Sequence, residues 1–421
     1  MVKKFLIAFF CVAAHGLFAQ NATISPYSYF GIGDLRTSGT VENQMMGRLS
    51  LYGDSIHLNL SNPAAYSKLR LTTYTAGISH NMFTLKDSQE KQNAKVTNLD
   101  YLAIGFPIAK KMGVGFGIMP LSSVGYELTD ETTNSDEQDV TNVFTGDGGL
   151  NRIFISIGFE PIKNVSIGVT GNFNFGTLEY QRIQSVEGVQ FGTLDRRVSR
   201  INGLDFNYAL NYTPTIKDKY TLFASVLVNT QGNLASENSA RLGSFSLVNG
   251  QEIEVIDVNL HPNNLKYTEL KIPTKTTLGL GFGENKKWFI GGEYSFQPFS
   301  EFKNEFLGID NVSYMDASTF TIGGYWVPDY RSLSGYHKRI TYRAGLRYEV
   351  SGLEVNGEEI NDFGINFGFG LPLSSSFSNL NLGFEVGKRG TTDENLIEEG
   401  YFNIKVGLSL NDKWFFKRKI D

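Results

Sequence analysis

A strict alternation of apolar and polar residues is the feature that most constrains how this chain can fold. Over residues 165–175 the odd positions are apolar or glycine, whereas the even positions are Ser, Gly, Thr and Asn. The same period of two recurs at 204–212, 363–371, 380–387 and 402–410. Because successive side chains of a β-strand point to opposite faces, each run presents one apolar face. The sequence therefore predicts an all-β fold.

The length and the number of these runs favour a membrane barrel. Each run has about ten residues, which is the length that a tilted strand needs to cross a bilayer. About fourteen runs lie at 70–80, 98–107, 112–128, 151–160, 165–176, 203–213, 219–229, 274–284, 287–298, 317–327, 338–349, 362–372, 379–388 and 400–410. A soluble sandwich or propeller is the alternative, but the repeat of roughly forty residues that a propeller would show is missing. We predict a transmembrane antiparallel β-barrel of about 14 strands over residues 70–410.

The connections between the runs are alternately long and short, beginning with a long one. The long connections are predicted as loops at 81–97, 129–150, 177–202, 230–273, 299–316, 350–361 and 389–399. Bacterial outer-membrane barrels have short periplasmic turns, long outer loops and an even number of strands. The prediction is thus a multi-pass barrel of the outer membrane, in contact with lipid and lipopolysaccharide, with both termini in the periplasm.

The first twenty residues have the pattern of a signal peptide. Lys3 and Lys4 precede an apolar stretch, and small residues lead to a cleavage site near Ala19 or Gln20. Residues 1–20 are therefore excluded from the fold. A signal peptide also predicts that the chain is exported, as a protein of the outer membrane must be.

Cys11 is the only cysteine, and it lies inside the predicted signal peptide. Processing as a lipoprotein is the alternative, but Phe9 and Phe10 stand where a lipoprotein cleavage box has small residues. The mature chain is thus expected to lack disulfides and thiolate metal sites. At the other end, residues 411–421 follow the last run and are predicted to form a short periplasmic tail.

Residues 21–69 do not alternate and are predicted to form a hatch inside the barrel. A barrel of this size has a wide lumen, and such lumens are often plugged. Near the end of this segment, Asn62-Pro63-Ala64 has the pattern of a helix start, with Asn62 as the N-cap and Pro63 in the first turn. A short helix starting there would fit inside a lumen.

The order of these features resembles that of the FadL family of outer-membrane transporters. The signal peptide, the short hatch ending near Asn62-Pro63-Ala64 and the fourteen strands carry this resemblance, and residues 25–34 resemble the start of Bacteroidetes-type paralogues. The resemblance implies a porin-like barrel for the passive uptake of hydrophobic small molecules. It also implies an alternative, because some FadL-like proteins of Bacteroidetes are accessory barrels that bind the type IX protein secretion translocon.

The resemblance also directs attention to Pro120 in the third predicted strand. In the FadL family this strand is kinked and opens the wall sideways toward lipid. Proline cannot donate a hydrogen bond to a neighbouring strand, so Pro120 is a candidate for a lateral opening. The alternative is that Pro120 only marks the outer end of the strand.

Charged residues on the inward phase of several strands are the remaining candidates for a site. Arg339, Arg343 and Arg347 share one face of a predicted strand, and Glu385 and Lys405 lie on the inward faces of two others. These side chains could form ion pairs that hold the hatch. They could also attract the carboxylate of a fatty-acid-like molecule, since arginine pairs bidentately with carboxylates.

Other chemistry is poorly represented in the sequence. The five histidines are scattered, with no serine or carboxylate at a diagnostic spacing. We therefore predict no catalytic residues, no metal and no cofactor, and expect a protein that is not an enzyme. The formal charge of −5 provides no basic surface for phosphates, which argues against nucleic acid as a partner.

Overall fold

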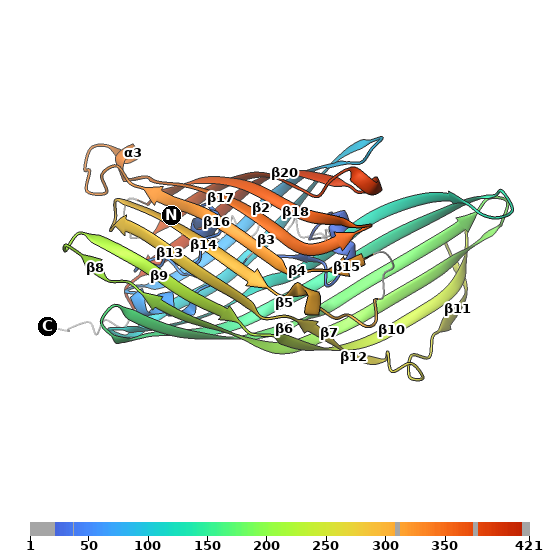
Figure 1. The fold of residues 1–421 in the computed structure, drawn as a ribbon, viewed down its shortest axis with the longest axis horizontal. Helices are drawn as coiled ribbons and strands as arrows, with labels where there is room; N and C mark the ends of the chain where they lie inside the picture. The colour runs from blue at the N-terminus through green and yellow to red at the C-terminus, as the bar shows by residue number, and fades with distance from the viewer. Residues whose placement is uncertain (1–21, 37, 308–311, 374–377, 415–421) are drawn as a thin grey trace, which may run out of the picture.

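The computed structural model describes residues 22–36, 38–307, 312–373 and 378–414, and it shows a closed antiparallel barrel of fourteen strands (Figure 1). The predicted signal peptide and most of the predicted tail lie outside the described residues. The last strand pairs with the first along its length, from Thr72–Asp412 to Lys86–Glu398, which closes the wall. The predicted fold class is confirmed.

The wall consists of β2 (Thr72–Lys86), β3 (Lys91–Ala109), β4 (Met112–Thr133), β5 (Asp139–Ile162), β6 (Val165–Val186), β7 (Phe191–Tyr212), β9 (Tyr220–Asn229), β13 (Lys275–Glu284), β14 (Trp288–Gln297), β16 (Ala317–Trp326), β17 (Thr341–Val355), β18 (Glu358–Pro372), β19 (Asn379–Arg389) and β20 (Glu398–Asp412). The shorter elements are η1 (Pro26–Tyr29), β1 (Asp34–Leu35), α2 (Val41–Gln44), η2 (Pro63–Lys68), β8 (Thr215–Ile216), β10 (Gly232–Ser246), β11 (Glu252–Asp257), β12 (Tyr267–Ile272), η3 (Phe299–Glu301), β15 (Val312–Tyr314), α3 (Tyr336–Arg339) and η4 (Asp393–Asn395). No helix in the described part of the chain has the length and apolarity needed to span a bilayer.

The alternation seen in the sequence sorts side chains between the two faces of the wall. On β7, Leu204 and Phe206 are exposed on the outside, whereas Asp205 and Asn207 are buried inside. The outer face is therefore apolar and the inner face polar. This is the reverse of a soluble barrel, and it is the arrangement required when lipid surrounds the wall.

The predicted long loops are wrong in most places, because the strands continue through them. Of the predicted loop 177–202, only 187–190 connect two strands, since β6 and β7 pair from Val165–Tyr212 to Gln184–Thr193. The predicted loop 230–273 contains β10, β11 and β12. Apolar alternation stops where a strand leaves the lipid, but backbone pairing needs no apolar side chains and continues beyond it.

The extended strands make the barrel wall longer on one side than on the other. β4, β5, β6 and β7 have 22 to 24 residues each, whereas β13, β14 and β16 have 10. The long strands, together with β10 and β11, project beyond the rest of the barrel (Figure 1). We call this part the outer extension.

Residues 22–69, here called the N-terminal segment, contact strands on opposite sides of the barrel. η2 packs against β4, β5, β6 and β7, and α2 packs against β18, β19 and β20. The Asn62 side chain accepts a hydrogen bond from Ala64 N at 3.1 Å and caps η2. Its amide also donates to Asn211 Oδ1 of β7 at 3.1 Å. Polar contacts of this kind attach the segment to the inner face of the wall.

Candidate functional site

The barrel wall contains a gap between β3 and β4. The two strands pair from the turn as far as Leu102–Ile118, and the pairing then stops. Beyond this point β3 continues with β2 alone, and β4 continues to Thr133 with β5. Two neighbouring strands therefore separate although each remains paired on its other side.

Pro120 lies two residues beyond the last pair of this interface. It is paired with Asn151 of β5, and a register shift follows between Pro120 and Ser122. A proline has no N–H to give to a neighbour on β3, and a bulge bends the strand that contains it. Because β4 continues to Thr133, the interpretation of Pro120 as the outer end of the strand is wrong.

β1 of the N-terminal segment occupies the edge of β4 that β3 leaves unpaired. Leu35 is paired with Ser122, and Arg36 N donates to Leu121 O at 2.9 Å. Just before β1, Gly33 has a φ of +90°, and a Cβ there would lie 2.5 Å from Ser123 O, so only glycine allows this close approach. A two-residue strand of the N-terminal segment thus covers part of the gap.

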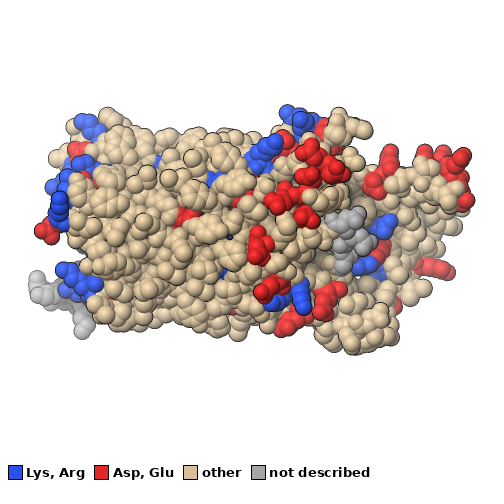
Figure 2. Space-filling model, viewed as in Figure 1, with Lys and Arg blue, Asp and Glu red and all other residues tan. Residues whose placement is uncertain are grey.

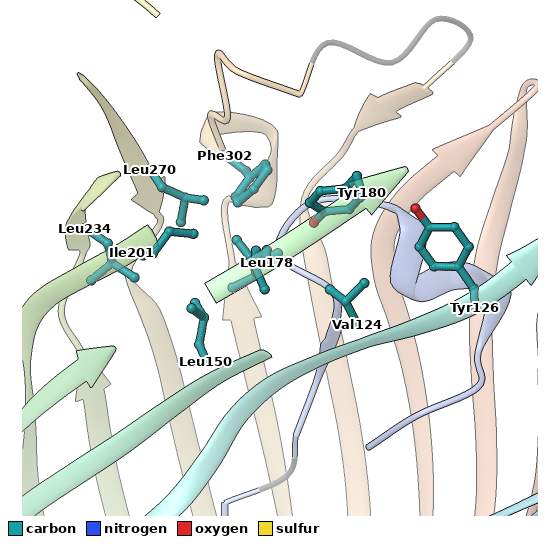
Figure 3. Packing of buried hydrophobic residues seen from close by; sticks show 10 residues of the cluster. Val124, Tyr126, Leu150, Leu178, Tyr180, Ile201, Leu234, Leu270 and Phe302 are labelled. Carbon is teal, nitrogen blue, oxygen red and sulfur yellow. The ribbon is translucent and has the colours of Figure 1, made fainter. Parts of the chain in front are cut away.

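An apolar cluster lies beside the gap, toward the outer extension (Figure 3). This outer apolar cluster consists of Ile32, Val124, Tyr126, Leu150, Leu178, Tyr180, Ile201, Leu234, Leu270 and Phe302. Tyr29 packs against it, with its ring centroid 5.2 Å from that of Tyr126. The cluster combines residues of the N-terminal segment, the outer extension and the connection after β14. Apolar side chains therefore line the inner side of the wall next to the gap.

A buried network of charges joins the N-terminal segment to the other side of the barrel. Glu385 is fully buried, and its carboxylate lies 2.9 Å from Arg48 of the N-terminal segment and 2.8 Å from Lys405. Lys405 also donates to Gln44 Oε1 at 2.7 Å. Arg347 lies 3.8 Å from the same carboxylate. We call Arg48, Arg347, Glu385 and Lys405, with the carboxylates of Glu349 and Asp362 beside Arg347, the polar network.

A cavity of about 190 Å³ separates the polar network from the gap. Arg48, Glu385 and Lys405 line one part of it, and Leu35 and Pro120 line another. Asp34 and Arg36, which flank Leu35 in the chain, line the cavity as well, so its lining toward the gap is mixed and includes Leu35, which is 46% exposed.

The predicted lumen charges are only partly brought together. Arg347, Glu385 and Lys405 belong to the polar network, and Arg343 lies apart from them, donating to Asn381 Oδ1 at 3.0 Å. The prediction for Arg339 is wrong, because β17 begins only at Thr341. Arg339 instead ends the short helix α3 with its guanidinium 5.4 Å from the Tyr336 ring centre. A continuous stripe of three arginines does not form.

Arg48 and β1 were not predicted as parts of a site. Both lie in the N-terminal segment, which has no periodic pattern that would show which side chains face the wall. Their partners did carry a signal, since a charged residue such as Glu385 on the inward phase of a lipid-spanning strand requires a partner.

A second charged contact lies within the N-terminal segment. His57 Nδ1 lies 2.6 Å from Asp54 Oδ2, and Nε2 lies 3.9 Å from Glu42 Oε1. Burial lowers the pKa of His57, but the charge of Asp54 and its hydrogen bond outweigh burial and raise the pKa above its ordinary value of 6.5. Burial raises the pKa of Asp54, and the same contact more than compensates, so that this pKa lies below 3.8.

The His57–Asp54 contact should make the attachment of the N-terminal segment depend on pH. Its stabilisation is complete below pH 6.5 as far as His57 is concerned, and is lost as the pH rises through the raised pKa of His57. It is also lost in acid, as the pH falls through the lowered pKa of Asp54. We expect that in His57→Gln this stabilisation no longer falls at alkaline pH. In the wild type the fall should be on the order of 2 kcal/mol, the strength of a charge-assisted hydrogen bond.

Hydrogen exchange of residues 54–57, corrected for the intrinsic pH dependence of exchange, measures this effect. His261→Gln is the matched control, because His261 is exposed in the outer extension. If the His57→Gln variant loses exchange protection at alkaline pH to the same extent as the wild type does, the assignment to His57 is contradicted.

The closed antiparallel wall of fourteen strands has the fold of FadL-type outer-membrane barrels. The toluene transporters TbuX of Ralstonia pickettii and TodX of Pseudomonas putida share 11% and 15% identity with this chain, each with a TM-score of 0.58. The comparisons cover 89% and 90% of this chain, and 99% of each transporter. A FadL homologue of Pseudomonas aeruginosa has a TM-score of 0.56 at 11% identity, covering 90% of this chain and 98% of the homologue. At such identities the likeness shows the fold alone.

The BamG family model matches residues 1–421, and the chain belongs to the BamG family. No curated protein sequence matches this chain. None of these comparisons supports the alternative of a type IX secretion partner.

Proposed function

We propose that this BamG-family barrel passes hydrophobic small molecules passively across the outer membrane and releases them sideways through the gap between β3 and β4. The observation that carries the proposal is the end of β3–β4 pairing at Leu102–Ile118, next to Pro120. A wall opening at the depth of the lipid suits molecules that dissolve in lipid. Structural neighbours that are described as toluene transporters support it.

The surroundings of the gap fit this direction of transport. The outer apolar cluster is a buried hydrophobic core beside the gap, on the side of the outer extension, and the polar network lies across the axial path. Moving a hydrophobic molecule past buried ion pairs would break them without compensation. A sideways exit avoids this cost.

We further propose that the N-terminal segment acts as the hatch and that the barrel end with the short turns faces the periplasm. In this orientation the outer extension projects from the cell surface, as the long connections of outer-membrane barrels do. β1 would then be the movable part of the seal, because its pairing with β4 is short, with two residue pairs and the adjoining Arg36 N–Leu121 O hydrogen bond. The protein needs no catalytic group for such passive transport.

A disulfide between β1 and β4 tests the seal directly. Leu35 and Ser122 are opposite each other in the register, at a separation of paired strands that a disulfide can span. We expect Leu35→Cys/Ser122→Cys, once oxidised, to reduce uptake of radiolabelled toluene and of a long-chain fatty acid by about tenfold, the effect of a barrier raised by about 1.4 kcal/mol. Reduction should restore uptake.

The matched control for the disulfide is Ile322→Cys/Leu346→Cys, which joins two fully paired strands on their lipid side. Its oxidation should leave uptake unchanged. Equal uptake by the oxidised and reduced forms of the Leu35/Ser122 variant would refute a sideways exit sealed by β1.

Replacing Pro120 with threonine tests the gap itself. Threonine restores the missing N–H and favours a strand, so we expect β3–β4 pairing to extend and uptake to fall severalfold with unchanged barrel abundance. Outer-membrane fractionation measures abundance, and the same labelled probes measure uptake. Normal uptake at normal abundance would show that Pro120 does not hold the wall open.

A further inference from the structure

β11 is an edge strand in the outer extension, with one side paired and the other side unpaired. Its residues Glu252–Asp257 pair with β10 through Arg241–Phe245, and no other described strand pairs with it. All six of its residues are exposed. A sheet edge of this kind presents unpaired N–H and C=O groups to any extended chain that approaches it.

The hydrogen-bond pattern indicates which backbone groups are free. Val258 N donates to Ala240 O at 2.9 Å, just beyond the paired part of β11. In an antiparallel pair, hydrogen-bonded and non-hydrogen-bonded residues alternate. The backbone N–H and C=O of Ile256 therefore point toward β10, and those of Val255 and Asp257 point to the free edge. The free edge therefore has a defined register.

Exposed apolar side chains surround this edge although lipid cannot cover them. Ile256 is 70% exposed, and Val248 in the turn before β11 is 84% exposed. Leu242 of β10 is paired with both Ile256 and Asp195 of β7, which places β11 level with Asp195. The apolar outer row of β7 ends at Leu204, about 30 Å further along the strand at 3.3 Å per residue. Apolar exposure so far from the lipid indicates another partner.

The side chains of the edge strand itself carry only negative charge, and the basic residues that interact with them, Arg241 and Arg196, lie on β10 and β7. Glu252 and Glu254 form no ion pair within the part of the chain that the structure describes, and the Asp257 pair with Arg241 is exposed. Acidic side chains gather at this end of the molecule in the space-filling view (Figure 2). Edge charges of one sign discourage pairing with neutral or acidic strands but favour a basic one.

We propose that β11 is a docking edge for an extended segment of another protein, in which Lys or Arg alternates with apolar residues. The segment adds to the sheet as a further strand. Backbone hydrogen bonds to Val255 and Asp257 provide the binding energy, and Glu252 and Glu254 select the basic residues. This is β-strand addition, in which the main chain gives affinity and the side chains give specificity. It does not depend on the proposed uptake of hydrophobic molecules.

The test uses the full chain in detergent micelles and two labelled peptides. One peptide alternates lysine with valine, and the other alternates glutamate with valine. We expect fluorescence anisotropy to show binding of the lysine peptide at least tenfold tighter than that of the glutamate peptide. Hydrogen exchange should show protection of the Val255 and Asp257 amides when the lysine peptide binds, which separates strand addition from adsorption to the micelle.

A pair of variants at one position isolates the backbone contribution. Val255→Pro removes an amide that points to the free edge and spares the bonds to β10, so it should weaken binding of the lysine peptide at least tenfold. Val255→Thr keeps both the amide and the branched side chain and should bind as the wild type does. Double charge reversal, Glu252→Lys with Glu254→Lys, should transfer the preference to the glutamate peptide.

Three results would overturn the proposal. The lysine peptide could bind no tighter than the glutamate peptide, or Val255→Pro could bind it as well as Val255→Thr does. A concentration-dependent dimer of the full chain that disappears in Val255→Pro would assign the edge to a second copy instead. Uptake of toluene is unaffected in each case, so failure here and failure of the proposed transport are distinguishable.

Discussion

Gly168→Val is expected to displace the N-terminal segment from the barrel. A Cβ at Gly168 of β6 would lie 2.3 Å from Ala64 N and 2.3 Å from the carbonyl carbon of Pro63. Both are backbone atoms of η2, so no side chain can rotate to relieve the clash. Overpacking of this kind costs about 3 kcal/mol, which shifts the population of the seated segment by more than about a hundredfold. The barrel should then conduct polar solutes that the wild type excludes.

Conductance in planar bilayers and hydrogen exchange over residues 54–69 measure this displacement. The same strand offers a matched control, because a Cβ at Gly171 would meet nothing closer than 3.6 Å. Gly171→Val changes the same residue type only three positions away, and both readouts should stay at wild-type values. If Gly168→Val keeps wild-type conductance and exchange, η2 does not depend on this close approach.

Glu385→Ala is expected to lower the stability of the folded protein strongly, because it removes a carboxylate that three cationic side chains share. Its carboxylate lies within 4 Å of Arg48, Lys405 and Arg347, and removing it leaves these cations buried without their common partner. Breaking a buried ion pair in this way costs about 3–5 kcal/mol. We expect urea unfolding in micelles to show this loss, together with faster exchange around Arg48.

Two comparisons make the Glu385 result specific. Glu385→Gln keeps the shape of the side chain and part of the hydrogen bonding, and it should destabilise less than Glu385→Ala. Glu398→Ala removes the partner of Lys388 in an exposed pair, where the cost is about 0–1 kcal/mol. Equal stability of Glu385→Ala and Glu398→Ala would mean that the polar network does not hold the N-terminal segment.

The contacts of Glu385 and Arg347 bear on whether the lumen charges hold the N-terminal segment or bind the carboxylate of a substrate. Its carboxylate binds Arg48 of the N-terminal segment, and Arg347 lies between Glu349 and Asp362. The arginine fork of Arg347 is thus occupied by carboxylates of the chain itself. This geometry favours ion pairs that attach the segment over a stripe that receives the carboxylate of a substrate.

The places where sequence-based predictions were wrong share one cause. Apolar periodicity reports contact with lipid, so it located the fourteen membrane crossings and missed the strand residues beyond the lipid, such as β10 and β11. It also placed Arg339 on a strand that begins only at Thr341. Where lipid is absent, pairing is decided by backbone hydrogen bonds, which leave no periodic apolar pattern in the sequence.

The sequence by itself determined a barrel of about fourteen strands with an apolar outside and a polar inside. Side-chain alternation and bilayer thickness are local constraints, and each strand carries them independently of its neighbours. Only the tertiary structure decided where the wall separates between β3 and β4, and that β1 covers β4 there. It also decided that Arg48 meets Glu385. These contacts join residues that are far apart in the chain, and residues 21–69 have no period, so the contacts depend on the closed barrel that brings these residues together.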